Sequence, residues 1–154
     1  MKKIIIVFFI SLAICSNFGN SKVSTEQVQN CSVKDFLGEW TFKEYLEGDV
    51  YAIFNINIMN DSNNDIIGNY CSISRYGSII DCSTEKDDNN ITGLFINDTI
   101  YINFNSFYDQ HGYGKAKIYK KKNDNDILIW ELGECSGNIY LPLSAILHKK
   151  SKEE

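Results

Sequence analysis

Apolar and polar residues alternate along residues 50–58, and this pattern limits what the chain can form. In Val50-Tyr51-Ala52-Ile53-Phe54-Asn55-Ile56-Asn57-Ile58 every even position is apolar. The same alternation recurs around Ile100, Ile118 and Trp130. Side chains of a strand point alternately to opposite faces, and one wet face is typical of antiparallel sheets. The pattern therefore predicts an all-β protein made of antiparallel strands.

Clusters of Asn and Asp separate the alternating segments at the spacing of hairpin turns. We expect about eight strands, a short additional strand at 138–141, and either a short helix or a last strand between Leu141 and Lys150. A meander of this kind, with little helix to cover an open sheet, most economically forms a small closed or nearly closed barrel. A β-sandwich is the alternative. The expected strands lie near residues 39–46, 50–59, 67–74, 78–83, 91–96, 99–106, 113–121 and 127–132.

Four of the five cysteines lie in this strand-rich region: Cys31, Cys71, Cys82 and Cys135. Four cysteines allow three pairings. A two-residue hairpin turn at Tyr76-Gly77 would place Cys71 opposite Cys82, and directly opposed residues are close enough for a disulfide. We therefore predict a Cys71–Cys82 bridge. The remaining pair, Cys31–Cys135, would close a loop of roughly 100 residues.

The first 21 residues are typical of a secretory signal peptide. Lys2 and Lys3 precede an apolar run from Ile4 to Ile14. This run is shorter than the about 20 apolar residues of a membrane-spanning helix. We expect cleavage between residues 15 and 21, followed by one disulfide-stapled β domain over residues 22–154. The protein would reach the periplasm or the cell exterior, where disulfides persist.

The segment Leu12-Ala13-Ile14-Cys15 resembles the lipobox of bacterial lipoproteins. The resemblance implies that Cys15 is lipidated, so that the protein is an outer-membrane lipoprotein attached only through this anchor. Ordinary cleavage is the alternative. Ile14 favours it, because the lipobox has a small residue before the cysteine.

An exported chain also has candidate sites for glycosylation in a eukaryotic host. Asn90-Ile91-Thr92 and Asn97-Asp98-Thr99 match the acceptor motif. In that host the protein would be secreted rather than periplasmic.

Loss of Lys2 and Lys3 leaves 13 of the 15 basic residues against 20 acidic ones, so the net charge changes from −5 to −7. An acidic surface disfavours nucleic acid and anionic membranes. It favours a positively charged protein partner, such as a basic toxin or enzyme. The residues expected at this interface are Tyr108, His111, Tyr113, Asp87 and Asp88.

Catalytic and metal motifs are weak in this sequence. His111 lies near Ser106 and Asp109, but a single loop rarely supplies a nucleophile, a base and an orienting group that converge. Asp61-x-Asn63-x-Asp65 begins like an EF-hand loop, yet Ile66 occupies the glycine position. We therefore expect no enzyme activity, no cofactor and no metal site.

The triplet Gly38-Glu39-Trp40 resembles the Gly-x-Trp motif that opens the barrel in lipocalins and related calycins. The resemblance implies that Trp40 packs across the barrel base, that ligands enter the opposite mouth, and that the cargo is small and lipophilic. Segments around Cys71 and Trp130 also resemble small exported bacterial proteins of a poorly characterised family.

Three functions follow from these observations. The leading hypothesis is an exported envelope or periplasmic protein-binding module, in particular an inhibitor or immunity protein against a toxin or hydrolase. The alternative is a calycin-like carrier of a small apolar ligand, and the third is an uncharacterised exported enzyme. A carrier requires an apolar cavity open at one mouth, whereas an inhibitor requires a filled interior with its tyrosines and acids outside.

Overall fold

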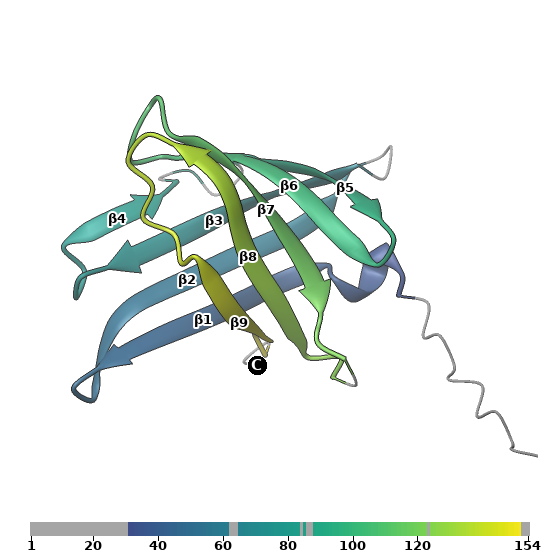
Figure 1. The fold of residues 1–154 in the computed structure, drawn as a ribbon, viewed down its shortest axis with the longest axis horizontal. Coiled ribbons are helices and arrows are strands. Elements are labelled where there is room, and N and C mark those ends of the chain that lie inside the picture. Colours follow the sequence, from purple (N-terminus) through teal and green to yellow (C-terminus); the bar gives the residue numbers. More distant parts are fainter. Residues whose placement is uncertain (1–30, 62–64, 84, 86–87, 123, 152–154) are drawn as a thin grey trace, which may run out of the picture.

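The computed structural model describes residues 31–61, 65–83, 85, 88–122 and 124–151. The expected signal peptide, Cys15 and Asp87 lie outside the described residues. The described chain contains nine strands and one short 3-10 helix, which confirms the all-β class (Figure 1). The elements are η1 (Val33–Asp35), β1 (Gly38–Leu46), β2 (Asp49–Asn60), β3 (Ile66–Ser74), β4 (Ile79–Cys82), β5 (Ile91–Ile96), β6 (Thr99–Asn105), β7 (Tyr113–Lys120), β8 (Ile127–Ser136) and β9 (Ser144–Lys149).

Eight of these strands form a closed antiparallel barrel. Each barrel strand pairs with the next one along the chain, except that β3 passes to β5, and β9 returns to β1. The strand β4 is extra and lies outside the barrel, because β3 pairs with β5 over its first residues and with β4 over its last. The predicted barrel is thus confirmed, with one additional hairpin.

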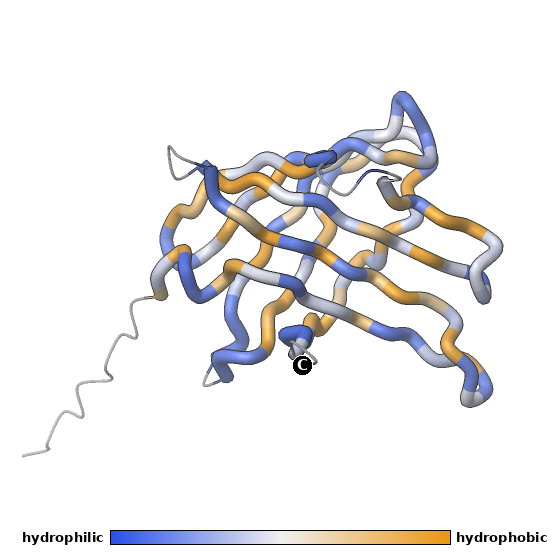
Figure 2. Tube along the Cα trace, turned by 180° about the vertical axis from the view of Figure 1, so that it is seen from behind, coloured by the Kyte–Doolittle hydropathy of each residue, from blue (hydrophilic) through white to orange (hydrophobic). Residues whose placement is uncertain are grey.

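The alternation in β2 sorts its residues between the barrel interior and the outer face. Phe54, Ile56 and Ile58 are each at most 2% exposed, whereas the intervening Asn55 and Asn57 are only half-buried. Figure 2 shows the resulting change of colour along neighbouring strands. Burial of this apolar face, at about 25 cal/mol per Å2, is the main stabilising term of such a barrel.

One end of the barrel is closed by the segment that leads into β1. The Trp40 side chain is fully buried, and its Nε1 donates a hydrogen bond to the Phe36 carbonyl oxygen at 2.8 Å. Phe36 is also fully buried, and its ring lies 5.5 Å from the ring of Phe95. Trp40 is therefore a structural residue at this end of the barrel. We call this the closed end.

The expected strand at 138–141 is absent, and the chain forms β9 further on. The Ser72 hydroxyl donates a hydrogen bond to the Tyr140 carbonyl at 2.6 Å, and Trp130 Nε1 donates one to the Pro142 carbonyl at 2.8 Å. Leu141 between them is 9% exposed. Because side chains take up these carbonyls, residues 138–143 cross the opposite end of the barrel as a strap instead of joining the sheet. Of the helix and the strand expected between Leu141 and Lys150, the strand is correct, because β9 spans Ser144–Lys149.

The disulfide Cys71–Cys82 is present, as predicted. The β3–β4 turn gives the expected register, with Cys71 directly opposite Cys82 and Ser74 opposite Ile79. This bridge ties the extra strand to the barrel wall.

The expected Cys31–Cys135 bridge is wrong, because both thiols are free. Cys31 precedes η1, in which an Asp35 oxygen lies 3.7 Å from Lys120 Nζ. Lys120 pairs with Leu128 at the closed end of β8, while Cys135 lies seven residues further along that strand. At about 3.3 Å per residue, roughly 23 Å of strand separates the two positions. The two cysteines belong to opposite ends of the barrel.

Candidate binding site at the open end of the barrel

The end opposite Trp40, which we call the open end, consists of two projecting hairpins and the loops beside them. Strands β1 and β9 pair only at Trp40–Lys149 and Thr41–His148, so the second half of β1 extends with β2 beyond the closed wall. The β3–β4 hairpin projects on the same side (Figure 1). The strap and the β6–β7 loop complete this end.

A pocket of about 250 Å3, which we call the mouth pocket, lies between the projecting strands and the strap. Strands β1 and β2 and the strap supply its apolar walls, whereas β3 supplies serines. Ser72 and Ser74 lie side by side on the β3 wall, but only Ser72 has a hydrogen-bond partner, because the buried Ser74 Oγ has none among the described residues. The lining residues are Phe42, Glu44, Tyr51, Ala52, Ile53, Phe54, Ser72, Ser74, Arg75, Ile139, Tyr140, Leu141 and Pro142.

Asp81 organises the loop beside this pocket. Its carboxylate is fully buried, although β4 lies outside the barrel. One oxygen accepts hydrogen bonds from the hydroxyls of Tyr70 and Ser106, each at 3.0 Å, and the other accepts from the backbone N–H groups of Phe107 and Tyr108 at 2.8 and 3.0 Å. Charged acceptors with several donors form the stronger class of hydrogen bonds. Asp81 therefore fixes the start of the β6–β7 loop.

Burial of Tyr70, and then the Asp81 carboxylate beside it, raise the pKa of the Tyr70 phenol far above its ordinary value. Tyr70 as a whole residue is 2% exposed. Its phenol is held between the core rings and the Asp81 carboxylate. It therefore remains a neutral hydrogen-bond donor at physiological pH.

Asp109 joins the β6–β7 loop to the strap. Its Oδ2 accepts hydrogen bonds from the backbone and side-chain nitrogens of Asn138, at 2.8 and 3.1 Å, and its Oδ1 accepts the His111 N–H at 3.0 Å. These hydrogen bonds lower the pKa of the Asp109 carboxyl, and the bond from the Asn138 backbone N–H contributes most. A Cβ at Gly137, where φ is +81°, would lie 2.8 Å from Gly112 Cα. The two loops are packed too closely for a side chain there.

Three of the five predicted interface residues, Tyr108, His111 and Tyr113, occupy this end. Tyr108 and Tyr113 are 51% and 58% exposed, and the His111 side chain is 94% exposed. Tyr108 stacks edge-on against Tyr140 of the strap, with ring centroids 4.9 Å apart. Asp88 is exposed in the β4–β5 loop. The structure thus brings Tyr108, His111 and Tyr113 together around one fixed loop, with Asp88 in a separate loop.

Ser106 and His111 do not form a catalytic pair. The Ser106 hydroxyl donates to Asp81 and accepts the backbone N–H groups of Tyr108 and Asp109, at 3.1 and 3.0 Å. His111 points to solvent and lies 4.0 Å from an Asp109 oxygen. Ser106 is therefore engaged in supporting the loop.

In the described part of the chain, no group of three or more His, Cys, Asp or Glu side chains is placed to hold a metal ion. Asp61 and Asp65 form a turn instead, in which the Asp61 N–H donates to the Asp65 carbonyl at 3.0 Å and an Asp61 carboxylate oxygen accepts the Asp65 N–H at 2.9 Å. The middle of the EF-hand-like segment, Asn63, lies outside the described residues.

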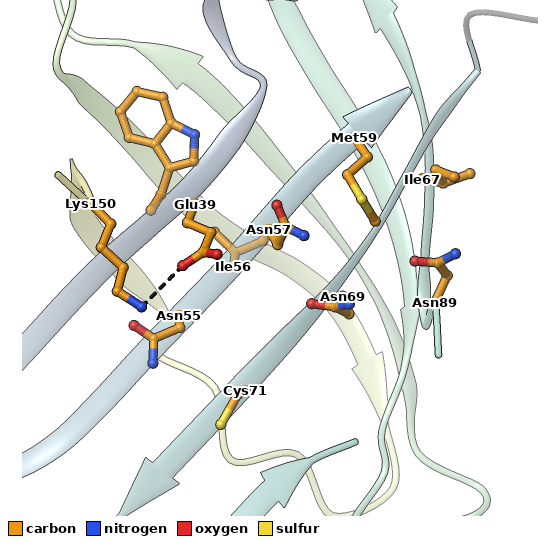
Figure 3. Close-up of a pocket in the computed structure, with 11 residues that line it drawn as sticks. Glu39, Asn55, Ile56, Asn57, Met59, Ile67, Asn69, Cys71, Asn89 and Lys150 are labelled. Atoms are coloured by element: carbon orange, nitrogen blue, oxygen red, sulfur yellow. Dashed lines mark hydrogen bonds and ion pairs between the residues drawn. The ribbon is translucent and has the colours of Figure 1, made fainter. Parts of the chain in front are cut away.

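A second hollow, of about 520 Å3, lies on the outer face of β2 and β3 (Figure 3). Asn55, Asn57 and Asn69 project into it, and the Lys150 ammonium pairs with Glu39 at 3.0 Å at one side. Asn57 and Asn69 are directly opposed across the two strands. These asparagines occupy outward positions of alternating strands, and Met59 and Ile67 add apolar surface beside them, so the hollow is a mixed polar and apolar part of the outer barrel wall.

The pattern of the sequence did not identify Asp81, Asp109 or Ser74 as site residues. A signal was present for Asp81, because the predicted register already placed it opposite Ser72, on the inner side of β3. An acid at an inward position requires hydrogen-bond partners, and this requirement marks it as an organising residue. For Asp109 and Ser74 the deciding contacts are with segments distant in sequence.

No known protein family, curated protein or solved structure matches this chain. Among the described residues, no helix has the length and apolar character needed to cross a membrane.

Proposed function

We propose that this protein is an exported protein-binding module, in particular an inhibitor or immunity protein that neutralises a basic toxin or hydrolase through the open end of the barrel. The observation that carries this proposal is the contrast between a filled interior and an exposed, rigid rim. A disulfide in the described chain is compatible with the export on which the proposal depends.

The interior of the barrel is occupied by packed rings. The Phe54 and Trp130 rings lie 4.8 Å apart, and the Tyr70 and Phe104 rings 5.7 Å apart, both edge-to-face. Phe104 in turn lies 6.3 Å from Trp130. A carrier of a small apolar ligand needs an internal cavity in this region, so the ring cluster favours a binding surface outside over a cargo inside.

Aromatic side chains concentrate at the open end. Of the five exposed tyrosines in the described residues, Tyr45, Tyr76, Tyr108 and Tyr113 lie there, and each is at least 51% exposed. Tyrosine offers a large contact area and a polar tip, and it is enriched at protein interfaces. The Asp81 and Asp109 contacts hold the loop of Tyr108 in place, which lowers the entropy lost on binding.

The charge of this end is suited to a basic partner. Glu44, Glu47 and Asp49 are exposed along the β1–β2 hairpin, and Glu85 and Asp88 are exposed in the β4–β5 loop. Acidic groups around a binding surface attract a positively charged protein and speed its association.

Affinity capture of the tagged mature protein from its own host tests this proposal. We expect one protein in stoichiometric amount, with binding that weakens as salt concentration rises. Recovery of an extractable lipid with no protein would overturn the proposal and favour a carrier.

A matched pair of variants then assigns the surface. The double variant Glu47→Gln/Asp49→Asn removes two charges at the open end, and we expect the association rate with the captured protein to fall about threefold to tenfold. The control Asp65→Asn/Asp98→Asn removes two exposed charges at the closed end and should leave the rate unchanged. Equal effects of the two variants would contradict a site at the open end.

A further inference from the structure

We propose that the projecting part of β1, residues 42–46, is a docking edge, which an extended segment of the partner joins as an additional antiparallel strand with a basic side chain opposite Glu44. The partner as the source of this segment rests on the proposed function. The capacity of the docking edge to pair with a strand rests on the β1 backbone and is tested separately.

The direction of the backbone groups in β1 defines the docking edge. Successive residues of a strand direct their N–H and C=O groups alternately to its two sides. The Glu39 carbonyl accepts the Lys150 N–H at 2.9 Å, so the odd-numbered residues of β1 face β9. The β1–β9 ladder ends at Thr41. Lys43 and Tyr45 therefore direct their backbone groups to a side on which no described strand pairs with them (Figure 1).

Backbone groups arranged in this way recognise an extended polypeptide. Lys43 and Tyr45 are exposed, and no described residue outside β2 forms a backbone hydrogen bond with either of them. Their donors and acceptors repeat at about 6.8 Å along the strand, which is the spacing of alternate residues in another strand. Such a row is a template for strand addition, in which main-chain hydrogen bonds supply the affinity.

The charges of the docking edge disfavour a second copy of this chain as the added strand. Only one antiparallel register lets Lys43 and Tyr45 of one copy bond to Tyr45 and Lys43 of another. This register places Glu44 directly opposite Glu44 of the second copy, and like charges in that position are destabilising. A strand from a different protein is therefore the better occupant.

The inward side chains of the docking edge define where the added strand meets the mouth pocket. Phe42 and Glu44 both line this pocket. Directly opposed residues of antiparallel strands point to the same face, so the two partner residues opposite them face the pocket as well. An apolar side chain suits the position opposite Phe42, and a basic one suits the position opposite Glu44. Arg75, the cation among the lining residues, belongs to the β3–β4 turn rather than to the docking edge.

The β1–β2 hairpin as a whole favours a basic strand. It carries Glu44, Glu47 and Asp49 against the single cation Lys43. None of these three acids forms an ion pair with a described residue. Opposite charges on paired strands are stabilising, so a basic segment gains at this hairpin what an acidic one loses.

A capped peptide, acetyl-Thr-Thr-Lys-Thr-Val-amide, tests the docking edge of the mature protein without the partner. Paired antiparallel, its lysine lies opposite Glu44 and its valine opposite Phe42. At saturation we expect it to shift the amide NMR signals of Lys43 and Tyr45 and to slow their exchange with deuterium.

Two N-methylated forms of the peptide distinguish strand pairing from side-chain binding. N-methylation of the second and fourth residues, whose N–H groups face β1, should weaken binding at least about tenfold. N-methylation of the third and fifth residues, whose N–H groups face away, is the matched control and should leave the affinity unchanged. Equal effects of the two forms, or signal shifts confined to other residues, would overturn the docking edge.

Two further measurements test the chemistry of the occupant. Replacement of the peptide lysine by glutamate places two acids opposite each other and should weaken binding about threefold to tenfold. Unchanged affinity would overturn the basic position opposite Glu44. Slow exchange of the Lys43 and Tyr45 amides before any peptide is added would show that another part of the chain, or a second copy, already covers the docking edge, and would overturn the proposal.

Two variants at one position then test whether the captured partner uses the docking edge. Lys43→Pro removes an edge-facing N–H, and proline is tolerated in edge strands, whereas Lys43→Thr removes the same charge and keeps the N–H. The amide spectrum and unfolding transition of each variant establish that the barrel is intact. We expect the partner to bind Lys43→Pro at least about tenfold more weakly than Lys43→Thr.

The outcomes separate the docking edge from the proposed function. Equal binding of the partner to the two variants would overturn the partner as the occupant, while the proposed protein-binding function stands. Failure to capture any partner would remove that function but leave the peptide result intact.

Discussion

The Tyr70 hydroxyl donates a hydrogen bond to the buried Asp81 carboxylate at 3.0 Å, and this contact joins the barrel core to the loop at the open end. Tyr70 belongs to the barrel strand β3, and Asp81 to the extra strand β4. The opposite oxygen of Asp81 holds the backbone of Phe107 and Tyr108. Core packing and the shape of the rim are therefore coupled through one carboxylate.

Asp81→Asn should destabilise the protein strongly. In the asparagine side chain an NH2 group takes the place of one carboxylate oxygen and faces hydrogen-bond donors. The hydroxyl and backbone N–H donors around position 81 also lose a charged acceptor. We expect the free energy of unfolding in urea to fall by about 2–4 kcal/mol. Asp88→Asn, at an exposed acid, serves as the control, with a change below about 0.5 kcal/mol. A similar small change for Asp81→Asn would show that the carboxylate does not hold the loop.

Alkaline pH should weaken the fold through Tyr70. Burial and the nearby Asp81 raise the pKa of this phenol above its unfolded value of about 10. The resulting stability is complete below pH about 10 and is lost as the pH rises toward the folded pKa, because only the unfolded chain releases the proton. Each pH unit above 10 should remove up to about 1.4 kcal/mol.

Comparison of Tyr70→Phe with Tyr101→Phe isolates this effect. Urea unfolding of both variants between pH 8 and 11 should show a shallower alkaline decline for Tyr70→Phe alone, since Tyr101 is 52% exposed. Parallel declines in the two variants would assign the alkaline sensitivity to other groups.

Thiol labelling should separate the cysteines into three classes. Cys135 is exposed and should react first with a maleimide, and Cys31, which packs partly against the core, should react more slowly. Cys71 and Cys82 should react only after reduction. Peptide mass mapping of the non-reduced protein gives the readout, and a cross-linked peptide containing Cys31 and Cys135 would contradict the structure.

Asn90→Asp should be far more harmful than Asn97→Asp. Asn90 as a whole residue is 8% exposed. Its side-chain Nδ2 donates a hydrogen bond to the Asn105 carbonyl at 2.7 Å, and its Oδ1 accepts one from the Tyr70 N–H at 3.3 Å. An aspartate loses that donor and places a charge beside a carbonyl, at an expected cost of about 2–3 kcal/mol in urea unfolding. Asn97 is exposed in a turn at φ +48°, where aspartate is tolerated. Equal stabilities would contradict the bridging role of Asn90.

The same pair of positions bears on glycosylation in a eukaryotic host. The Asn90 amide is engaged inside the barrel wall, while Asn97 is accessible in the β5–β6 turn. Expression in such a host should therefore modify Asn97 in the folded protein and leave Asn90 unmodified, as intact mass measurement would show.

Strand positions and the Cys71–Cys82 bridge could be predicted because both depend on local order. Alternation fixes the inner face of β2, and counting outward from Tyr76-Gly77 fixes the register of a short hairpin. The Cys31–Cys135 bridge failed because elimination among cysteines ignores strand length, and β8 separates the two positions along the barrel axis. Spacing in sequence carries no information about which end of a barrel a residue reaches.

The candidate site was only partly predictable. Tyr108, His111 and Tyr113 were found because exposed aromatic and polar residues in a loop are recognisable in the sequence. The support beneath them was not, since Asp109 contacts Asn138 and Ser72 contacts Tyr140 across the open end. The strap at 138–143 has an apolar composition like that of a strand. Its carbonyls, however, accept hydrogen bonds from the side chains of Ser72 and Trp130, which lie elsewhere in the sequence.

The narrow contact between β1 and β9 gives the barrel a seam. Here two strand pairings, Trp40–Lys149 and Thr41–His148, join strands more than 100 residues apart in sequence, together with the backbone bond and the ion pair between Lys150 and Glu39. The other barrel strands pair with near neighbours along the chain. Closure of so long a loop carries the largest entropic penalty and offers the fewest bonds in return. The seam should therefore be the last strand pair of the barrel wall to form during folding. In the native protein its amides should exchange with deuterium before those of the other barrel strand pairs.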